Sequence, residues 1–222
     1  EVLENGIVLY FLEDRELPLV NLSLVVRSGS AYDPVGKEGL AGLTASVMRT
    51  GGTKKTSGPD VDLALEYMAA TIEPASTAEY TSWSLNAMRP DLDKAMDILS
   101  QILREPRFDP GRAQLAKDLK LEDLRRIYDD PQKLAFREFN RCLYRGNARG
   151  RMASRTSVQA TSPEEMRAFH RKYYFPQNMM VAISGDLSKA EAGDLIRKYF
   201  GDWQDQGKVE KVPPPRRQPA PA

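Results

Sequence analysis

The chain has 222 residues, enough for roughly one to two domains and for a hydrophobic core that needs no disulfide or metal. Its 32 basic and 31 acidic side chains give a net charge of +1, which excludes a general electrostatic attraction to nucleic acid or anionic lipid. No run approaches the ~20 apolar residues of a transmembrane helix, and the single cysteine, Cys142, excludes an internal disulfide.

The first quarter of the chain predicts two strands and a short helix. The apolar, β-branched run within 2–13 indicates a strand, and the run at 19–30 indicates a second, largely buried strand. A turn-rich loop leads to residues 39–50, whose apolar side chains recur at the spacing of one helix face. Gly51 and Gly52 end this helix.

The next segment predicts a helix and then an edge strand. Residues 57–60, Ser-Gly-Pro-Asp, carry a helix-start signal, and two short strands follow at 70–76 and 80–87. Pro74 confines the first of these to the edge of a sheet, because proline cannot donate to a strand ladder. The candidate edge residues are Thr71, Ile72, Glu73, Ala75 and Ser76.

The second half of the chain is mainly helical in pattern, with helices predicted at 91–105, 112–128 and 132–144. A further helix begins at 161–165, where a hydroxyl cap precedes proline and two acids, and it contains the only histidine, His170. We interpret His170 as a surface or hydrogen-bonded residue and not as a metal ligand.

The last elements are a strand within 173–187 and a helix at 189–203. We predict one domain at 1–205, followed at 206–222 by a proline-rich linker or disordered tail. Four arginines occupy the loop before the 161–165 helix start. We interpret them as solvated surface charges, although binding of phosphate or an acidic partner stays open. They are Arg145, Arg149, Arg151 and Arg155.

Two stretches of the chain carry a resemblance to a known family. Gly39-Leu40-Ala41 and Gly52-Thr53 frame the first helix, and a Tyr-x-Pro-x-Asn signature precedes a strand that ends in Gly-Asp. The residues of that signature are Tyr174, Pro176, Asn178, Gly185 and Asp186. In this order and spacing they resemble the insulinase/pitrilysin zinc peptidases, family M16, over about residues 5–203. In that family the frame is G-L-A-H-x-x-E-H-x-x-x-x-G-T.

The metal-binding side chains of that family are missing from this sequence. Gly42 and Ser46 stand at the two histidine positions, and Ala45 stands at the glutamate position. Positions i, i+3 and i+4 share one helix face, where two imidazoles would hold zinc and the glutamate would act as general base. The resemblance implies a third ligand at Asp123, or less well at Glu122, which we interpret as a solvated acidic pair. We therefore predict no catalytic residue, no metal site and no cofactor.

The order of elements predicts an α+β fold, a mixed and mainly antiparallel sheet with helices packed on one face. The resemblance implies specifically the fold of the M16 peptidase half-domain, which is of the LuxS-like metallohydrolase type. It also implies a second M16-like half beyond the linker and a homologous H-x-x-E-H subunit as the partner in a heterodimer. In this family the edge strand accepts peptide by strand addition. The alternative is an edge that proline simply protects from aggregation.

Our leading hypothesis is a non-catalytic domain that helps to form a peptide-binding chamber with a zinc-bearing homologue. One alternative is a structural or assembly subunit with no role in cleavage, and another is an active peptidase that binds zinc through Ser46, Glu122 and Asp123. The chain starts at Glu1 without methionine or a signal sequence, which suggests that a leading part was removed. The compartment is therefore undetermined, and the bacterial periplasm or cell envelope stays open.

Overall fold

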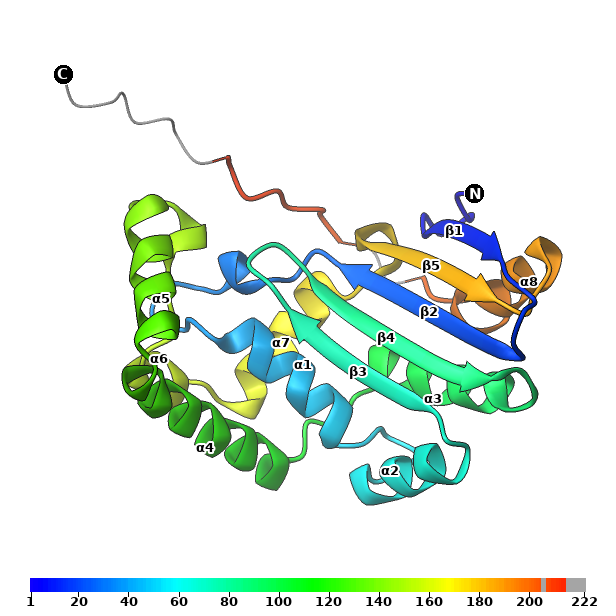
Figure 1. The fold of residues 1–222 in the computed structure, drawn as a ribbon, viewed down its shortest axis with the longest axis horizontal. Helices are drawn as coiled ribbons and strands as arrows, with labels where there is room; N and C mark the ends of the chain where they lie inside the picture. Colours follow the sequence, from blue (N-terminus) through cyan, green and yellow to red (C-terminus); the bar gives the residue numbers. More distant parts are fainter. Residues whose placement is uncertain (205–206, 215–222) are drawn as a thin grey trace.

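A five-stranded sheet forms the centre of the computed structural model, which describes residues 1–204 and 207–214 (Figure 1). The strand order is β1-β5-β2-β4-β3; β1 and β5 are parallel, and the other three pairs are antiparallel. The strands are β1 (Val8–Glu13), β2 (Leu19–Val26), β3 (Thr71–Ser76), β4 (Thr81–Met88) and β5 (Met179–Gly185). The sheet is thus mixed and mainly antiparallel, as the sequence predicts.

Helices pack behind this sheet in Figure 1, which confirms the predicted α+β fold. The helices are α1 (Leu40–Thr50), α2 (Gly58–Tyr67), α3 (Leu92–Arg104), α4 (Pro110–Arg126), α5 (Pro131–Leu143), α6 (Arg155–Gln159), α7 (Pro163–Tyr173) and α8 (Lys189–Phe200). Short 3₁₀ turns accompany them: η1 (Ser30–Tyr32), η2 (Arg89–Asp91), η3 (Ile127–Asp129), η4 (Ala148–Gly150) and η5 (Pro176–Asn178). None of the helices in the described ranges combines the length and hydropathy that crossing a bilayer requires.

The strand β2 differs from its predicted burial. It lies at the centre of the sheet, but only one of its faces is covered, since Leu22 and Leu24 are buried while Asn21 and Ser23 are exposed. Side chains alternate between the two faces of a strand, and the helices cover one of them. The prediction of a largely buried strand was therefore wrong for the open face.

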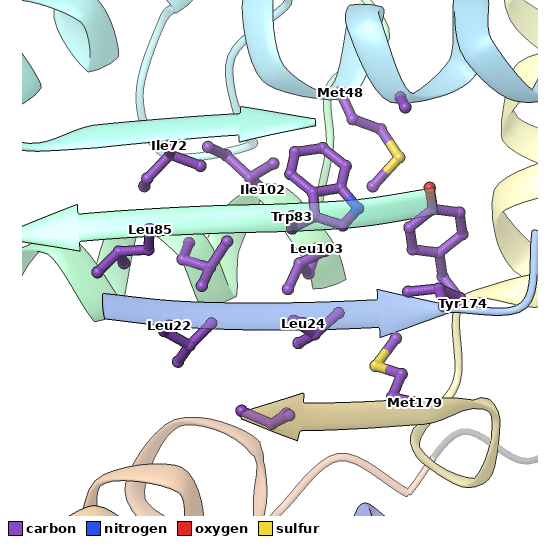
Figure 2. Close-up of a cluster of buried hydrophobic side chains, with 14 of the residues drawn as sticks. Leu22, Leu24, Met48, Ile72, Trp83, Leu85, Ile102, Leu103, Tyr174 and Met179 are labelled. Atoms are coloured by element: carbon purple, nitrogen blue, oxygen red, sulfur yellow. The ribbon is translucent and has the colours of Figure 1, made fainter. Parts of the chain in front are cut away.

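The first helix, α1, is fixed against the sheet by the hydrophobic core. Trp83 of β4 is fully buried and lies beside Met48 of α1 and Leu103 of α3, as Figure 2 shows. Truncating one such buried side chain to alanine typically costs about 2–5 kcal/mol. The core therefore holds the opposite face of α1, which carries Gly42 and Ser46, in a defined position.

The predicted helix starts depend on side-chain caps that the structure contains. Ser57 caps α2, and Ser162 forms a capping box with Glu165 at the start of α7. The helix α4 begins two residues earlier than predicted, because Asp109 caps it and Pro110 takes the first helical position.

The segment 207–214 contains neither helix nor strand, yet it contacts the domain. The Tyr173 hydroxyl donates to Glu210 Oε2 at 3.2 Å, Lys172 Nζ lies 3.3 Å from the same oxygen, and Arg149 donates to the Pro213 carbonyl at 2.6 Å. The predicted boundary at 205–206 and the end of the tail at 215–222 lie outside the described residues. Whether the segment is a linker therefore stays a prediction.

Candidate functional site

A cavity of about 740 Å³ opens between α1, β3, α4 and the residues that follow η4. Gly42, Ala45 and Ser46 line it from α1, and Asp123 lines it from α4. The fold thus gathers around one space all four positions at which the family resemblance implies metal chemistry. We call this space the cavity.

The other acidic candidate, Glu122, does not line the cavity. Its carboxylate accepts hydrogen bonds from Arg125 at 2.9 Å and from Arg126 at 2.8 Å, and these bonds lower the pKa of Glu122 to about 2. Of the two neighbouring acids, the fold therefore directs Asp123 to the cavity and leaves Glu122 in a surface ion pair.

The side chains around the cavity do not fit the zinc ion that the family implies. Gly42 and Ala45 carry no donor atom, and a serine hydroxyl is not among the usual zinc ligands. Across residues 1–204 and 207–214, no three His, Cys, Asp or Glu side chains are placed to hold a metal. His170 is buried elsewhere, with Nε2 2.8 Å from the Leu103 carbonyl, and Cys142 is exposed on α5.

The start of α1 is held by Asp33, a residue that the sequence analysis missed. The residue is 2% exposed, and its carboxylate accepts hydrogen bonds from the backbone N–H groups of Gly39 at 2.7 Å and Ala41 at 2.8 Å. Burial raises the pKa of Asp33 to about 7, although these two donors and the charge of Arg151 act in the opposite direction. The Asp33-Pro34 pair before a glycine-rich helix start was the available signal.

The strand β3 is the terminal strand of the sheet, as Pro74 predicts. Its Glu73 and Ala75 carbonyls accept hydrogen bonds from serine hydroxyls of β4. Residues two apart direct their backbone groups to the same side, so Ile72, Pro74 and Ser76 face the open edge. The Ile72 carbonyl already accepts from Arg49 Nε at 2.6 Å, and Pro74 has no N–H. The edge is therefore only partly able to pair with another strand.

Cationic side chains outnumber acidic ones around the cavity. Its charged lining residues are Arg49, Lys120, Arg137, Arg151, Glu73 and Asp123. Arg49 is neutralised, since Nη1 lies 2.7 Å from Asp62 and Nη2 lies 3.8 Å from Glu73. The remaining lining charge is carried by one lysine and two arginines against a single aspartate.

The arginines of the 145–155 loop separate in the structure. Arg149 pairs with Glu79 at 2.7 Å, Arg155 lines a neighbouring hollow beside α4, and Arg151 lines the cavity. Nothing in the local sequence pattern marked Arg137 of α5 or Lys120 of α4 as their companions.

Comparison with known proteins gives two family matches. Residues 11–157 match the family described as "Insulinase (Peptidase family M16)", and residues 160–222 match "Peptidase M16 inactive domain". The chain is 24% identical to mitochondrial-processing peptidase subunit beta of Homo sapiens, covering 91% of this chain and 42% of that protein. It is 22% identical to cytochrome b-c1 complex subunit 1 of Bos taurus, covering 95% of this chain and 44% of that protein.

The fold is also similar to a solved structure, the peptidase M16 inactive domain from Pseudomonas fluorescens. The TM-score is 0.90 at 23% identity, and the match covers 97% of this chain and 53% of that one. The chain thus spans about half the length of the proteins that it matches. Since the first family match alone covers more than half of the sequence, the chain belongs to the insulinase family of peptidases, M16.

Proposed function

We propose that this chain is a non-catalytic M16 domain that helps to form a peptide-binding chamber with a zinc-bearing homologous subunit or domain. The observation that carries the proposal is the cavity. It brings Gly42, Ala45, Ser46 and Asp123 together and offers no imidazole to a metal. A domain that keeps this space and lacks the donor atoms is suited to binding a peptide and not to activating water.

The open edge of β3 supports the peptide-binding part of the proposal. Pro74 and Ser76 line the cavity, and their outward carbonyls, together with the Ser76 N–H, are available for strand addition. A peptide paired there would lie beside the small side chains of α1, because an added Cβ at Gly42 would meet Ser76 Cβ at 4.0 Å.

The test is a cleavage assay with the full-length protein and a homologue that carries an intact H-x-x-E-H motif. Ser46→Glu places a charged side chain in the cavity, and it should reduce cleavage of long peptides by the pair while this domain stays folded. Ala190→Glu is the matched control, because it adds the same charge at an exposed position of α8 that does not line the cavity. Ala45 is a poorer test position, because it is 2% exposed and belongs to the core.

Two results would count against this function. Cleavage that is identical for Ser46→Glu and Ala190→Glu would exclude a role of the cavity in binding substrate. Failure of the full-length protein to associate with any H-x-x-E-H homologue in sedimentation or pull-down would exclude the partnership.

A purely structural role in an assembly is the second candidate. It is favoured by the similarity to a relative that is named as subunit 1 of the cytochrome b-c1 complex. In that case peptides would not bind in the cavity, and both glutamate variants would leave cleavage by any associated peptidase unchanged.

A further inference from the structure

Within residues 1–204 and 207–214, two arginines that line the cavity have no carboxylate partner. Arg137 Nη2 donates to the Ala153 carbonyl at 2.7 Å, and Arg151 Nη2 donates to the Ala31 carbonyl at 2.9 Å. Neither takes part in an ion pair within the described ranges, although Arg149, two positions before Arg151, pairs with Glu79 at 2.7 Å. The Nε of Arg151 is buried and has no hydrogen-bond partner in the same part of the chain.

The backbone carbonyls hold these side chains in place without neutralising them. A guanidinium group has five N–H donors in a planar fork, so each arginine keeps donors for a further acceptor. Asp33 is an acidic side chain whose charge interacts with that of Arg151. Both of its carboxylate oxygens, however, accept hydrogen bonds from backbone N–H groups at the start of α1. The pair is therefore fixed in position, cationic and incompletely bonded.

Arg151 lies close to the part of β3 that can still accept a strand. The backbone N–H of Ser30 donates to the Thr77 carbonyl at 2.9 Å, and the N–H of Ala31 donates to the Ala78 carbonyl at 2.8 Å. Arg151 is anchored on Ala31, so it stands directly beyond the end of β3. Thr77 and Ala78 line the cavity together with Arg151.

We infer that Arg137 and Arg151 form a carboxylate-binding subsite of the cavity, which takes an acidic side chain or the C-terminal carboxylate of a bound peptide. The inference rests on the proposed peptide-binding function. Planar carboxylates match the guanidinium fork with two parallel hydrogen bonds. Lys120 adds a further positive charge to the lining. Of the two acids that line the cavity, Glu73 lies 3.8 Å from Arg49, and Asp123 has no ion pair in the described ranges.

The experiment measures peptide binding to the full-length protein by fluorescence anisotropy. Three unstructured peptides are compared: one with a central glutamate and an amidated C-terminus, the same peptide with glutamine, and the glutamine peptide with a free C-terminus. We expect at least one carboxylate peptide to bind about tenfold more tightly than the amidated glutamine peptide, which is about 1.4 kcal/mol. The peptide that gains affinity shows whether the subsite binds a side-chain carboxylate or a C-terminal carboxylate.

Variants of the two arginines test the assignment. Arg137→Gln and Arg151→Gln should remove the preference for the carboxylate peptide, while Arg151→Lys, which keeps the charge, should retain part of it. Arg141→Gln is the matched control, since Arg141 lies one turn further along α5 and pairs at 2.5 Å with Glu138 outside the cavity. Circular dichroism shows whether each variant is folded. If Arg151→Gln does not fold, Arg137→Gln by itself tests the subsite.

The possible outcomes separate the inference from the function on which it rests. Equal affinity for all three peptides, or a preference that survives Arg137→Gln, overturns the subsite and leaves the peptide-binding function in place. If no peptide binds in any arm, the proposed function fails and the subsite fails with it.

Discussion

Replacing Gly42 by alanine should stabilise the domain. Gly42 lies inside α1, and an added Cβ would meet only Ser76 Cβ, at 4.0 Å, which is ordinary van der Waals contact. Glycine within a helix costs about 1 kcal/mol relative to alanine, because its backbone loses more freedom on folding. We therefore expect the free energy of unfolding to rise by about 0.5–1 kcal/mol, and the melting temperature by about 1–4 °C for a chain of this size.

Urea and thermal unfolding followed by circular dichroism measure this effect, with two glycine variants as controls. Gly193→Ala in α8 gains the same helix propensity but should stabilise less, because its Cβ would lie 3.1 Å from Arg197 Nη1, and the Arg197 guanidinium is paired with Asp194 and Glu1. Gly185→Ala should destabilise, because Gly185 has a φ of +135° and the new Cβ would lie 2.1 Å from the Leu19 carbonyl oxygen. If Gly42→Ala lowers the unfolding midpoint, the site has no room, and the absent side chain at this position serves close packing.

The site and its surroundings lead to three further predictions. The purified protein should contain well below one equivalent of zinc by elemental analysis, because the cavity lacks imidazoles; one tightly bound equivalent would contradict this. The pKa of Asp33 is raised from 3.8 to about 7, so the folded state keeps a proton that the unfolded state releases. The stabilisation by this protonated carboxyl is fully present below pH 3.8 and is lost as pH rises through 7. The advantage of wild type over Asp33→Asn in urea unfolding should therefore be greater at pH 5 than at pH 8, and an equal difference would refute the raised pKa. Glu210→Gln should change stability by less than about 1 kcal/mol, because its ion pair is exposed, but it should accelerate proteolysis within 207–214; an unchanged rate would show that the Glu210 contacts do not hold this segment.

Features set by nearby residues were predictable from the sequence. Ser162 and Glu165 form a capping box three positions apart, and Pro74 restricts β3 to an edge whatever surrounds it. The family resemblance also favoured Asp123 over its neighbour Glu122, and the structure places Asp123 at the cavity.

The charges of the cavity were not predictable, because they depend on contacts between distant segments. Arg137 reaches the cavity only because α5 packs beside the loop that contains Ala153, and Asp33 becomes buried only where η1 meets α1. The bond from Arg49 to the Ile72 carbonyl likewise joins a helix to a strand that starts 22 positions later. Propensity and periodicity describe single helices and strands, so they carry no information about such tertiary contacts.

The partial closure of β3 and the charge of the cavity together favour a particular mode of peptide binding. Arg49 occupies the Ile72 carbonyl and Pro74 lacks an N–H, so backbone pairing is confined to the Ser76 end of the strand. Short pairing contributes few hydrogen bonds, and each is worth only about 0.5–1.5 kcal/mol net. Under the proposed function, a peptide held there needs a second anchor, and Arg151, which donates to the Ala31 carbonyl beyond the end of β3, would provide one together with Arg137. Under the proposed function, Gly42 and Ser46 of α1, which stand at the family's histidine positions and line the cavity, would leave room there for a side chain of the bound peptide.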